Sequence, residues 1–391
     1  MVLSPQRFFR AVWRDLKQYY VQPNLIALIF RKTKSGADFK NWSDVGSILV
    51  VKLDEIGDFV LATAFLRELR RNCRGGKIVL VVAAQVYNLA ETCPYVDKVY
   101  KFNHKVEGHF GVLRRRFRAL MFAYRNLWAE RFEVAVVPRF DADTYGATEI
   151  AAFSNANTVI GYSEKCTILK STANPGYDAL LSHTIKPGEH RGTEMRANLY
   201  ILEKFQAVVN SCESELWLTK EDETFAASRL NRVGKYIAVA TGASKPDRCW
   251  PIEKYQELVR WCSEEYGLTP VLIGLVSDPK LSGALSLLGE TTLRQAAAVL
   301  KRCVLFVGND SGPKHIAAAM RTPVVEISAL RLGKDPLHPN SPDRFQACSA
   351  AQVVVRPPQG GPGDLAIDEI TVEQVQAAVR SLLASTVLWK K

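Results

Sequence analysis

Short apolar runs recur along this chain, and most are followed by a turn and a segment with helical spacing of apolar residues. In the first half, the runs expected to form buried strands lie at 45–53, 77–83, 99–102, 134–137 and 158–161. In the second half they lie at 236–240, 270–274, 304–307, 323–327 and 353–355. Because strands that alternate with helices form parallel sheets, this pattern predicts an α/β fold with doubly wound parallel sheets.

The two series of strands are joined by a polar stretch with helical spacing at residues 205–235. A length of 391 residues favours two domains of roughly 150 residues each. We therefore expect two Rossmann-like domains that face a central cleft. The expected division is an N-terminal extension at 1–44, a first domain at 45–215, a second domain at 216–370, and a C-terminal helix at 371–391 that packs back across the domains.

The composition is that of a globular protein, with 47% hydrophobic and 23% charged residues. No apolar run approaches the roughly 20 residues of a membrane-spanning helix, and the N-terminus lacks the features of a secretory signal. We therefore expect a cytoplasmic protein. The eight cysteines are scattered without a CxxC pair, which indicates reduced thiols and neither a zinc site nor a thioredoxin-like motif.

The net charge of +11 is unevenly distributed along the chain. Residues 1–44 carry eight basic and three acidic side chains, and residues 101–118 carry six basic side chains against Glu107 alone. No nucleic-acid-binding motif accompanies this charge. An anionic membrane surface fits it better, because apolar and aromatic residues recur at helical spacing among the basic ones. This N-terminal stripe consists of Phe8, Phe9, Val12, Trp13, Leu16, Tyr19 and Tyr20, with Arg7, Arg10, Arg14 and Lys17 between them. The alternative is that the stripe docks on the protein body.

Three turns at strand ends carry residues suited to chemistry. The first contains Gly57, which allows a tight turn, and Asp58 at the start of the following helix. A carboxylate there can accept a proton from a hydroxyl group, which is worth about 10²–10⁴-fold in rate. Equally, Asp58 alone can be explained as an acid that complements the helix dipole.

The second turn, residues 241–251, follows a buried strand. Gly242 and Ser244 allow a close approach of the backbone to a ligand, and Lys245 and Arg248 add positive charge suited to a diphosphate. A basic loop taken alone is usually solvated surface.

The third turn lies between the strand at 304–307 and an Ala-rich helix. A glycine-bearing turn at a strand end directs the free N–H groups and dipole of the next helix toward an anion, so Ser311 and Gly312 suggest a phosphate site. Asp310 can equally cap the helix, and His315 can be an ordinary core histidine. These alternatives weaken when the three turns are taken together.

In combination, the three turns resemble those of glycosyltransferase family 9, the bacterial heptosyltransferase family. The resemblance rests on ILVVKLDEIGDFVLATAFLRELR at 48–70, TGASKPDRCWP at 241–251 and VGNDSGPKHIAAAMRTPVV at 307–325. Weaker similarity occurs at 131–137, 159–164 and 190–202. It implies a GT-B architecture, with a nucleotide-sugar donor on the C-terminal domain and the acceptor on the N-terminal domain.

The resemblance also assigns residue roles. Asp58 matches the catalytic base, and Lys52 matches a basic position in the preceding strand. The positions implied to bind the donor are Ala243, Ser244, Arg248, Asp278, Asp310, Ser311, Gly312 and His315. Gly57 and Arg139 complete the expected site on the acceptor side, although ordinary loop polarity explains Arg139 equally well.

The expected activity is inverting, metal-independent transfer of a sugar to a lipid-linked saccharide such as lipopolysaccharide core. The resemblance implies a heptose as the sugar and ADP-heptose as the donor. We expect no cofactor, no bound metal and no nucleic-acid partner, and a peripheral location on the inner face of the bacterial inner membrane. The alternative is a non-catalytic nucleotide- or glycan-binding protein on the same scaffold.

Overall fold

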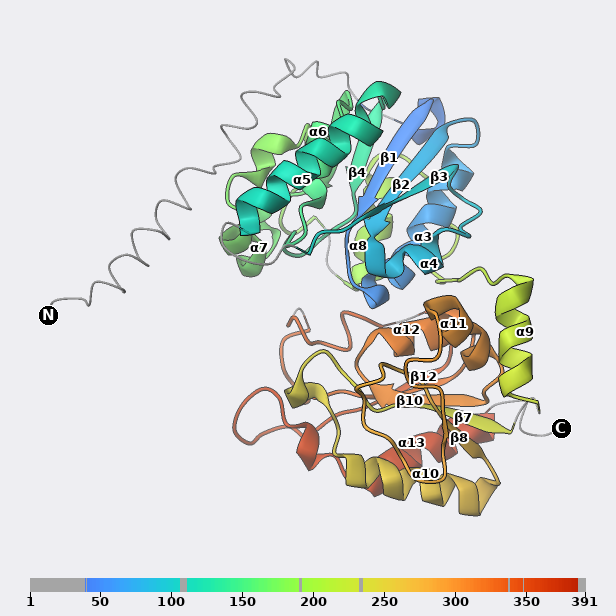
Figure 1. The fold of residues 1–391 in the computed structure, drawn as a ribbon. Helices are drawn as coiled ribbons and strands as arrows, with labels where there is room; N and C mark the ends of the chain where they lie inside the picture. The colour runs from blue at the N-terminus through green and yellow to red at the C-terminus, as the bar shows by residue number, and fades with distance from the viewer. Residues whose placement is uncertain are drawn as a thin grey trace, which may run out of the picture.

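The computed structural model describes Phe39 and residues 41–105, 111–189, 192–231, 235–336, 338–346 and 348–385. The predicted N-terminal stripe lies outside these residues. Two α/β domains face each other, with the N-terminal domain above the C-terminal domain in Figure 1. The predicted fold of two doubly wound parallel sheets is confirmed.

The first sheet has six parallel strands in the order β3-β2-β1-β4-β5-β6. They are β1 (Ser47–Lys52), β2 (Lys77–Ala83), β3 (Lys98–Phe102), β4 (Val134–Val137), β5 (Thr158–Tyr162) and β6 (His183–Ile185). The helices are α3 (Ile56–Asn72), α4 (Tyr87–Ala90), α5 (Gly111–Asn126), α6 (Ala147–Phe153), α7 (Ile168–Ala173) and α8 (Glu194–Lys204). Because successive strand residues point to opposite faces, Ile48 and Val50 pack with α3 and α8, whereas Leu49 and Val51 pack with α5 and α6.

The second sheet repeats this topology in the order β12-β11-β10-β7-β8-β9. Its strands are β7 (Tyr236–Ala240), β8 (Thr269–Leu272), β9 (Leu285–Ser286), β10 (Leu305–Asn309), β11 (Val324–Ile327) and β12 (Gln352–Val355). The helices are α9 (Lys220–Arg229), α10 (Ile252–Tyr266), α11 (Leu293–Lys301), α12 (Gly312–Ala319) and α13 (Val372–Ser385). Ile237 and Val239 pack with α10 and α13 on one face, and Ala238 and Ala240 pack with α11 and α12 on the other.

The apolar layer on the facing sides is continuous between the domains, because α3 contacts α12 and both belong to one buried cluster. Polar contacts reinforce this interface. Arg294, in the first turn of α11, donates to the Asn88 carbonyl at 2.8 Å. Arg344, from the segment between β11 and β12, pairs with Asp141 at 2.9 Å and with Glu194 at 3.0 Å. The domains therefore meet closely on either side of the cleft.

The C-terminal helix packs differently from the expectation. Val372–Ser385 lies against β10, β11, β12 and α10, all within its own domain. Contacts with the N-terminal domain come instead from α11, α12 and the segment that contains Arg344. Residues 386–391 of the expected helix lie outside the described part of the chain.

Two strands were missed by the sequence pattern. β6 spans only His183–Ile185 and β9 only Leu285–Ser286, and neither has a run of apolar residues long enough to stand out. Both lie at an edge of their sheet. Edge strands pair on one side only, and so they need a shorter apolar stretch than the central ones.

Candidate functional site

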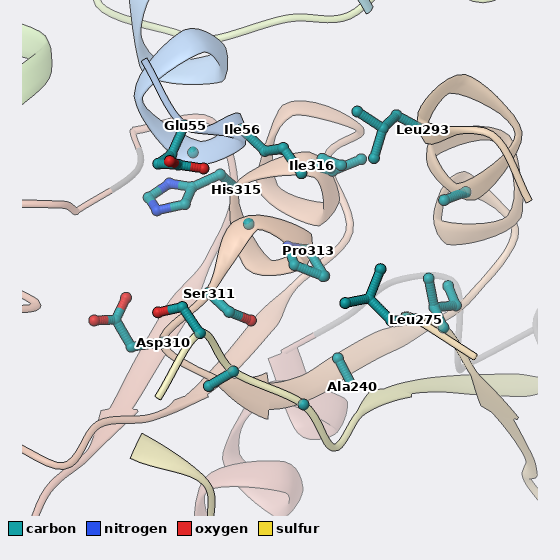
Figure 2. Close-up of a pocket in the computed structure, with 18 of the residues that line it drawn as sticks. Glu55, Ile56, Ala240, Leu275, Leu293, Asp310, Ser311, Pro313, His315 and Ile316 are labelled. Carbon is teal, nitrogen blue, oxygen red and sulfur yellow. The ribbon is translucent and has the colours of Figure 1, made fainter. Parts of the chain in front are cut away.

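A cavity of about 590 Å³ lies between the domains and is lined by residues of both (Figure 2). The N-terminal domain contributes the start of α3, and the C-terminal domain contributes the turns after β7 and β10. The predicted site residues that line the cavity are Gly57, Asp58, Ala243, Ser244, Arg248, Asp278, Asp310, Ser311, Gly312 and His315. Lys52 and Arg139 do not line it; they lie behind Asp58.

Two helices begin on opposite walls of this cavity and touch there. A Cβ atom at Gly57 would lie 2.6 Å from Cδ2 of His315, and a Cβ atom at Gly312 would lie 3.1 Å from Cβ of Ile56. Contacts between a Cβ atom and another heavy atom below about 3 Å are sterically forbidden. Glycine at position 57 therefore allows the imidazole of α12 to pack on the backbone of α3.

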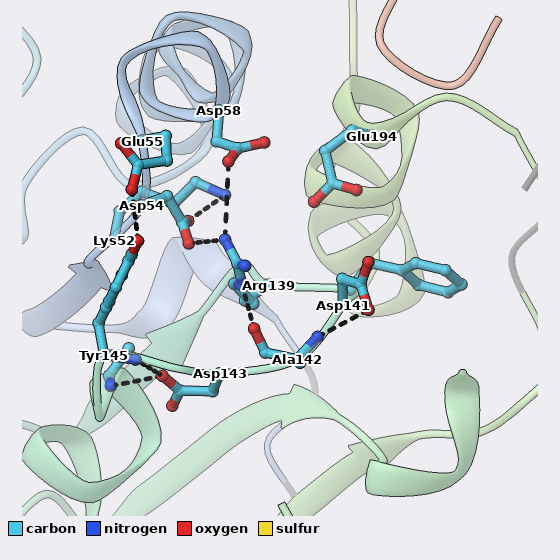
Figure 3. A network of polar contacts seen from close by, with 12 residues as sticks. Lys52, Asp54, Glu55, Asp58, Arg139, Asp141, Ala142, Asp143, Tyr145 and Glu194 are labelled. Atoms are coloured by element: carbon cyan, nitrogen blue, oxygen red, sulfur yellow. Dashed lines mark hydrogen bonds and ion pairs between the residues drawn. The ribbon is translucent and has the colours of Figure 1, made fainter. Parts of the chain in front are cut away.

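Asp58 lies in the first turn of α3 and faces a cluster of charged groups (Figure 3). Its Oδ2 atom is 3.7 Å from Nη1 of Arg139. The same guanidinium makes a closer ion pair with Asp54, and its Nε donates to the Ala142 carbonyl at 2.8 Å. Asp54 also binds Nζ of Lys52 at 2.7 Å. Both cations are therefore held mainly by Asp54, and Asp58 has only a longer contact.

The two neighbouring aspartates differ in pKa as a result. Burial raises the pKa of Asp58 to about 7, and the negative charges of Asp54 and Glu194 add to this rise while Arg139 opposes it. Burial acts in the same direction on Asp54, but Arg139 and Lys52 outweigh it and lower the pKa of that carboxyl. Since an efficient general base has a pKa close to the working pH, Asp58 is suited to accept a proton near neutrality.

On the opposite wall, Asn309 holds the turn after β7 against the end of β10. Its buried side chain accepts hydrogen bonds from the Trp250 N–H and the Tyr255 hydroxyl, both at 3.0 Å. The same side chain donates to the Thr241 carbonyl at 2.9 Å. The loop that carries Ala243, Ser244 and Arg248 is therefore fixed at both ends by one residue of the neighbouring strand.

Asp310 is bound by two cations. Its Oδ2 is 2.5 Å from Nη2 of Arg248, and its Oδ1 is 2.6 Å from Nζ of Lys314. The buried Lys314 also pairs with Oε1 of Glu326 in β11, at 2.7 Å. A chain of alternating charges thus runs from the cavity wall into the sheet.

Charged neighbours again give two nearby carboxyl groups, those of Asp310 and Glu326, different pKa values. Although burial opposes it, Lys314 and Arg248 lower the pKa of Asp310 to about 2. Burial raises the pKa of Glu326 to about 7, and Asp310 adds to this rise while Lys314 opposes it. Asp310 therefore stays ionised at the cavity wall.

The start of α12 offers groups that suit an anion. Ser311 is the N-cap residue, and its side chain makes no capping hydrogen bond. Its hydroxyl donates instead to the Asn309 carbonyl at 3.2 Å. In the first turn of the helix Pro313 has no N–H group, and the Lys314 N–H donates to the Ser311 carbonyl at 3.3 Å. The groups that can bind a phosphate here are therefore the Gly312 N–H, the helix dipole and the nearby Arg248.

The far end of the cavity is mostly apolar and contains one carboxylate, that of Asp278. Cβ atoms at Gly242 and Gly274 would lie 2.4 and 2.2 Å from carboxylate atoms of Asp278, so both glycines make room for this side chain. Oδ2 of Asp278 accepts a hydrogen bond from the Leu275 N–H at 2.8 Å. Leu293 and other apolar side chains line the wall nearby. A carboxylate beside apolar side chains suits the sugar and base of a nucleoside.

His315 is 5% exposed, and burial followed by the charge of Lys314 lowers its pKa to about 3. The imidazole is therefore neutral at physiological pH. Its Nδ1 atom has no hydrogen-bond partner within the described part of the chain. A neutral ring in this position can form a hydrogen bond but cannot supply charge to a diphosphate.

Within the described ranges, no cluster of three or more His, Cys, Asp or Glu side chains is arranged to hold a metal ion. A search of the same residues for a helix of sufficient length and apolar character to cross a bilayer also finds none.

Four residues of these networks were not foreseen as site residues: Asp54, Asn309, Lys314 and Glu326. Asn309 and Lys314 lie inside the stretch 307–325 that carries the family resemblance, but their orientation depends on contacts with other elements. A charged Glu326 in the otherwise apolar strand Val324–Ile327 is a signal that could have been read from sequence. Asp54 gave no such signal, because its partner Arg139 lies 85 positions away.

Comparison with known proteins agrees with this geometry. Residues 195–330 match the model of glycosyltransferase family 9 (heptosyltransferase). The lipopolysaccharide core heptosyltransferase OpsX of Haemophilus influenzae is 26% identical over 125 residues, which cover 29% of this chain and only 36% of the relative. Lipopolysaccharide heptosyltransferase 3 of Escherichia coli is 20% identical over 290 residues, covering 69% of this chain and 79% of the relative.

A solved structure shows the same fold. The ADP-heptose lipopolysaccharide heptosyltransferase II of Escherichia coli superposes with a TM-score of 0.64 at 19% identity. The superposition covers 87% of this chain and 99% of that structure. The predicted GT-B arrangement of the two domains is thereby confirmed.

Proposed function

We propose that the chain is a member of glycosyltransferase family 9, whose model matches residues 195–330. In this proposal it catalyses inverting transfer of a heptose from ADP-heptose to a lipid-linked saccharide such as lipopolysaccharide core. The observation that carries the proposal is the shared cavity. Asp58, whose pKa is about 7, lies there opposite Arg248 and the start of α12, which together suit a phosphate group.

In the proposed reaction, the donor diphosphate lies against the start of α12 and Arg248, and the nucleoside lies toward Asp278. Asp58 removes the proton of an acceptor hydroxyl group. The oxygen attacks the anomeric carbon from the face opposite the diphosphate, and the electrons of the breaking C–O bond pass to the departing nucleotide. Such a reaction depends on orienting the two substrates, and no covalent intermediate with the protein is involved.

Arg248 must exchange partners for this reaction to occur. It pairs with Asp310 at 2.5 Å in the structure. A diphosphate carries more negative charge than one carboxylate, and arginine binds phosphate oxygens in a bidentate manner. We expect the donor to draw Arg248 away while Lys314 continues to neutralise Asp310.

The identity of donor and acceptor is supported by the names of the relatives, which include lipopolysaccharide and ADP-heptose. We propose a peripheral location at the inner face of the bacterial inner membrane, since the acceptor is lipid-linked and the chain carries a net charge of +11. Association with an anionic membrane is part of this proposal. We propose that neither a metal nor a cofactor takes part.

The test is release of free nucleotide from ADP-, UDP- and GDP-sugars, measured with and without deacylated lipopolysaccharide core as acceptor. We expect release only with ADP-heptose and only when the acceptor is present. Donor binding without acceptor-dependent release would instead support a non-catalytic nucleotide-binding protein. Equal turnover of UDP- or GDP-sugars would contradict the proposed donor.

A further inference from the structure

The outer face of α5 exposes two large aromatic side chains. Phe117 is 62% exposed and Tyr124 is 61% exposed. They are seven residues apart, which places them on the same face of the helix, two turns from each other. The opposite face holds Ala119 and Ala123, which are fully buried against the sheet. The exposed rings are thus presented by a helix that is firmly packed from behind.

The same helix is strongly basic. The segment Gly111–Asn126 contains five arginines and no acidic residue. Two of them face inward: Arg116 pairs with the buried Glu149, and Arg115 donates to the Thr144 carbonyl at 2.7 Å. The remaining three are exposed, and they flank the aromatic rings: Arg114, Arg118 and Arg125.

A second exposed apolar group lies at the start of α7. Ile168 is 89% exposed and Leu169 is 50% exposed. The Thr167 hydroxyl, at the N-cap of this helix, donates to Oδ1 of Asp141 at 3.1 Å. Both helices are therefore anchored on one loop, residues 139–145, since α5 holds it through Thr144.

This loop also carries Arg139, 3.7 Å from Asp58. The two helices that carry the exposed apolar and cationic side chains therefore contact the loop that holds Arg139 next to Asp58. Aromatic and aliphatic side chains among arginines are typical of protein surfaces that enter the headgroup region of an anionic bilayer.

We propose that the outer face of α5 and the start of α7 form a docking surface for an anionic lipid bilayer, which presents the lipid-linked acceptor to the loop that carries Arg139. This inference rests on the proposed function, for which it names the membrane-contacting surface. The docking surface is defined as Arg114, Phe117, Arg118, Tyr124, Arg125, Ile168 and Leu169.

Charge complementarity selects the lipid over two other occupants. Residues 1–44 carry eight basic and three acidic side chains, so they would meet the arginines of α5 with charge of the same sign. A second copy of the chain would place one basic face against another. An anionic bilayer neutralises the arginines and receives the aromatic rings at its interface, where such rings are most stable.

The proposal is tested by co-sedimentation of the full chain with vesicles of phosphatidylcholine, alone or mixed with phosphatidylglycerol. We expect binding only to the mixed vesicles, weakening as salt is added. The double substitution Arg114→Gln and Arg118→Gln should weaken binding about thirty-fold, from the attraction that each basic residue contributes. Phe117→Ser with Tyr124→Ser should weaken binding even at low salt.

Val208→Ser provides a matched control, because Val208 is 66% exposed but lies beside Asn72 at the end of α3, on the other face of the sheet. This variant should bind as the native chain does. Native-like binding by both α5 variants would overturn the proposal. So would faster proteolysis of residues 1–38 in those variants without any change in vesicle binding, since it would mean that this segment covers the face.

Catalysis gives a second, separate readout. The α5 variants should transfer sugar to a deacylated, water-soluble acceptor at the native rate and lose activity toward the acceptor embedded in mixed vesicles. Equal rates with both acceptor forms would contradict the docking surface while leaving the proposed reaction intact. If the native chain transferred sugar to neither acceptor, that result would contradict the proposed reaction. Vesicle binding would still test the docking surface.

Discussion

Asp58 and Asp310 face the same cavity from opposing helix starts, yet their carboxyl groups differ in pKa by several units. Asp310 is in direct contact with two cations and has a pKa of about 2. Asp58 has one cation at 3.7 Å, already bound to Asp54, and a pKa of about 7. Position in the fold therefore does not determine ionisation; the partners of each carboxylate do.

Each domain has a pair of carboxyl groups near the cavity, and the two pairs are arranged in opposite ways. Each has one carboxyl group whose pKa is lowered by contact with cations, and another whose pKa is raised to about 7. In the N-terminal domain the ion-paired Asp54 is buried, and Asp58, the carboxyl group with the raised pKa, faces the cavity. In the C-terminal domain the ion-paired Asp310 faces the cavity, and Glu326, the carboxyl group with the raised pKa, is buried. One wall can accept a proton, and the other keeps a fixed charge.

The largest effect is expected from Asp58→Asn, which removes the proposed base and leaves a side chain of equal size. We expect kcat to fall by about 10²–10⁴-fold with little change in the KM for the donor. Steady-state nucleotide release with saturating acceptor measures this. Near-native kcat in a variant with native thermal stability would exclude Asp58 as the base.

On the opposite wall, Lys314→Met should destabilise the protein, because it leaves Glu326 and Asp310 without their shared cation. Breaking a buried ion pair costs about 3–5 kcal/mol. Adding Glu326→Leu removes the unpaired buried carboxyl, so the double variant should recover a large part of the loss in urea-induced unfolding. A double variant no more stable than Lys314→Met alone would contradict this account of the pair.

The contact between the two helix starts can be broken at Gly57. A Cβ atom there would lie 2.6 Å from the His315 ring, so Gly57→Ala should separate the walls and lower kcat/KM by roughly 10–100-fold. Gly75→Ala is the control, because a Cβ at Gly75 meets nothing within 4 Å. Equal activity of the two variants would show that close packing at Gly57 is not needed.

A smaller but more specific effect is expected from Asp54→Asn. Without the negative charge of Asp54, the positive charges of Arg139 and Lys52 are no longer neutralised. They then favour the ionised form of Asp58, and the pKa of Asp58 falls. The acid limb of the pH profile of kcat/KM should therefore move down by about one unit or more, and the weaker base should lower the plateau rate. The other charged or titratable groups facing Asp58, namely Glu194 and His315, are unchanged.

Glu149→Gln is the matched control for Asp54→Asn. Glu149 is also a buried carboxylate paired with an arginine of the same domain, at 2.5 Å from Arg116. Its loss should reduce stability without moving the acid limb. An unshifted profile in Asp54→Asn, or the same shift in both variants, would contradict the role of Asp54 in setting the protonation of Asp58.

Much of the fold could be predicted from the sequence because central parallel strands are buried on both faces and appear as continuous apolar runs. β2 and β7 occupy the predicted ranges, 77–83 and 236–240. The edge strands β6 and β9 were missed because two or three residues carry no periodic signal. The packing of α13 on its own domain could not be foreseen either, since helical spacing identifies an apolar face but not its partner.

The site divides in the same way. Asp58 and Asp310 could be located because both follow a buried strand and precede a helix, where ligands bind in parallel sheets. Their protonation could not be predicted, since it depends first on burial, and then on Arg139 for Asp58 and on Lys314 and Arg248 for Asp310. The roles assigned to these and the other site residues stay predictions, although all of them except Lys52 and Arg139 line the cavity.

The central claim is that Asp58 is a base poised near neutrality across the cavity from a permanently charged donor site. Its most direct test is the pH dependence of kcat/KM of the native chain, which reports the ionisation of the free enzyme. We predict a half-maximal value near pH 7 and a decline of about tenfold per pH unit below it. A profile that stays flat down to about pH 5 would contradict the claim.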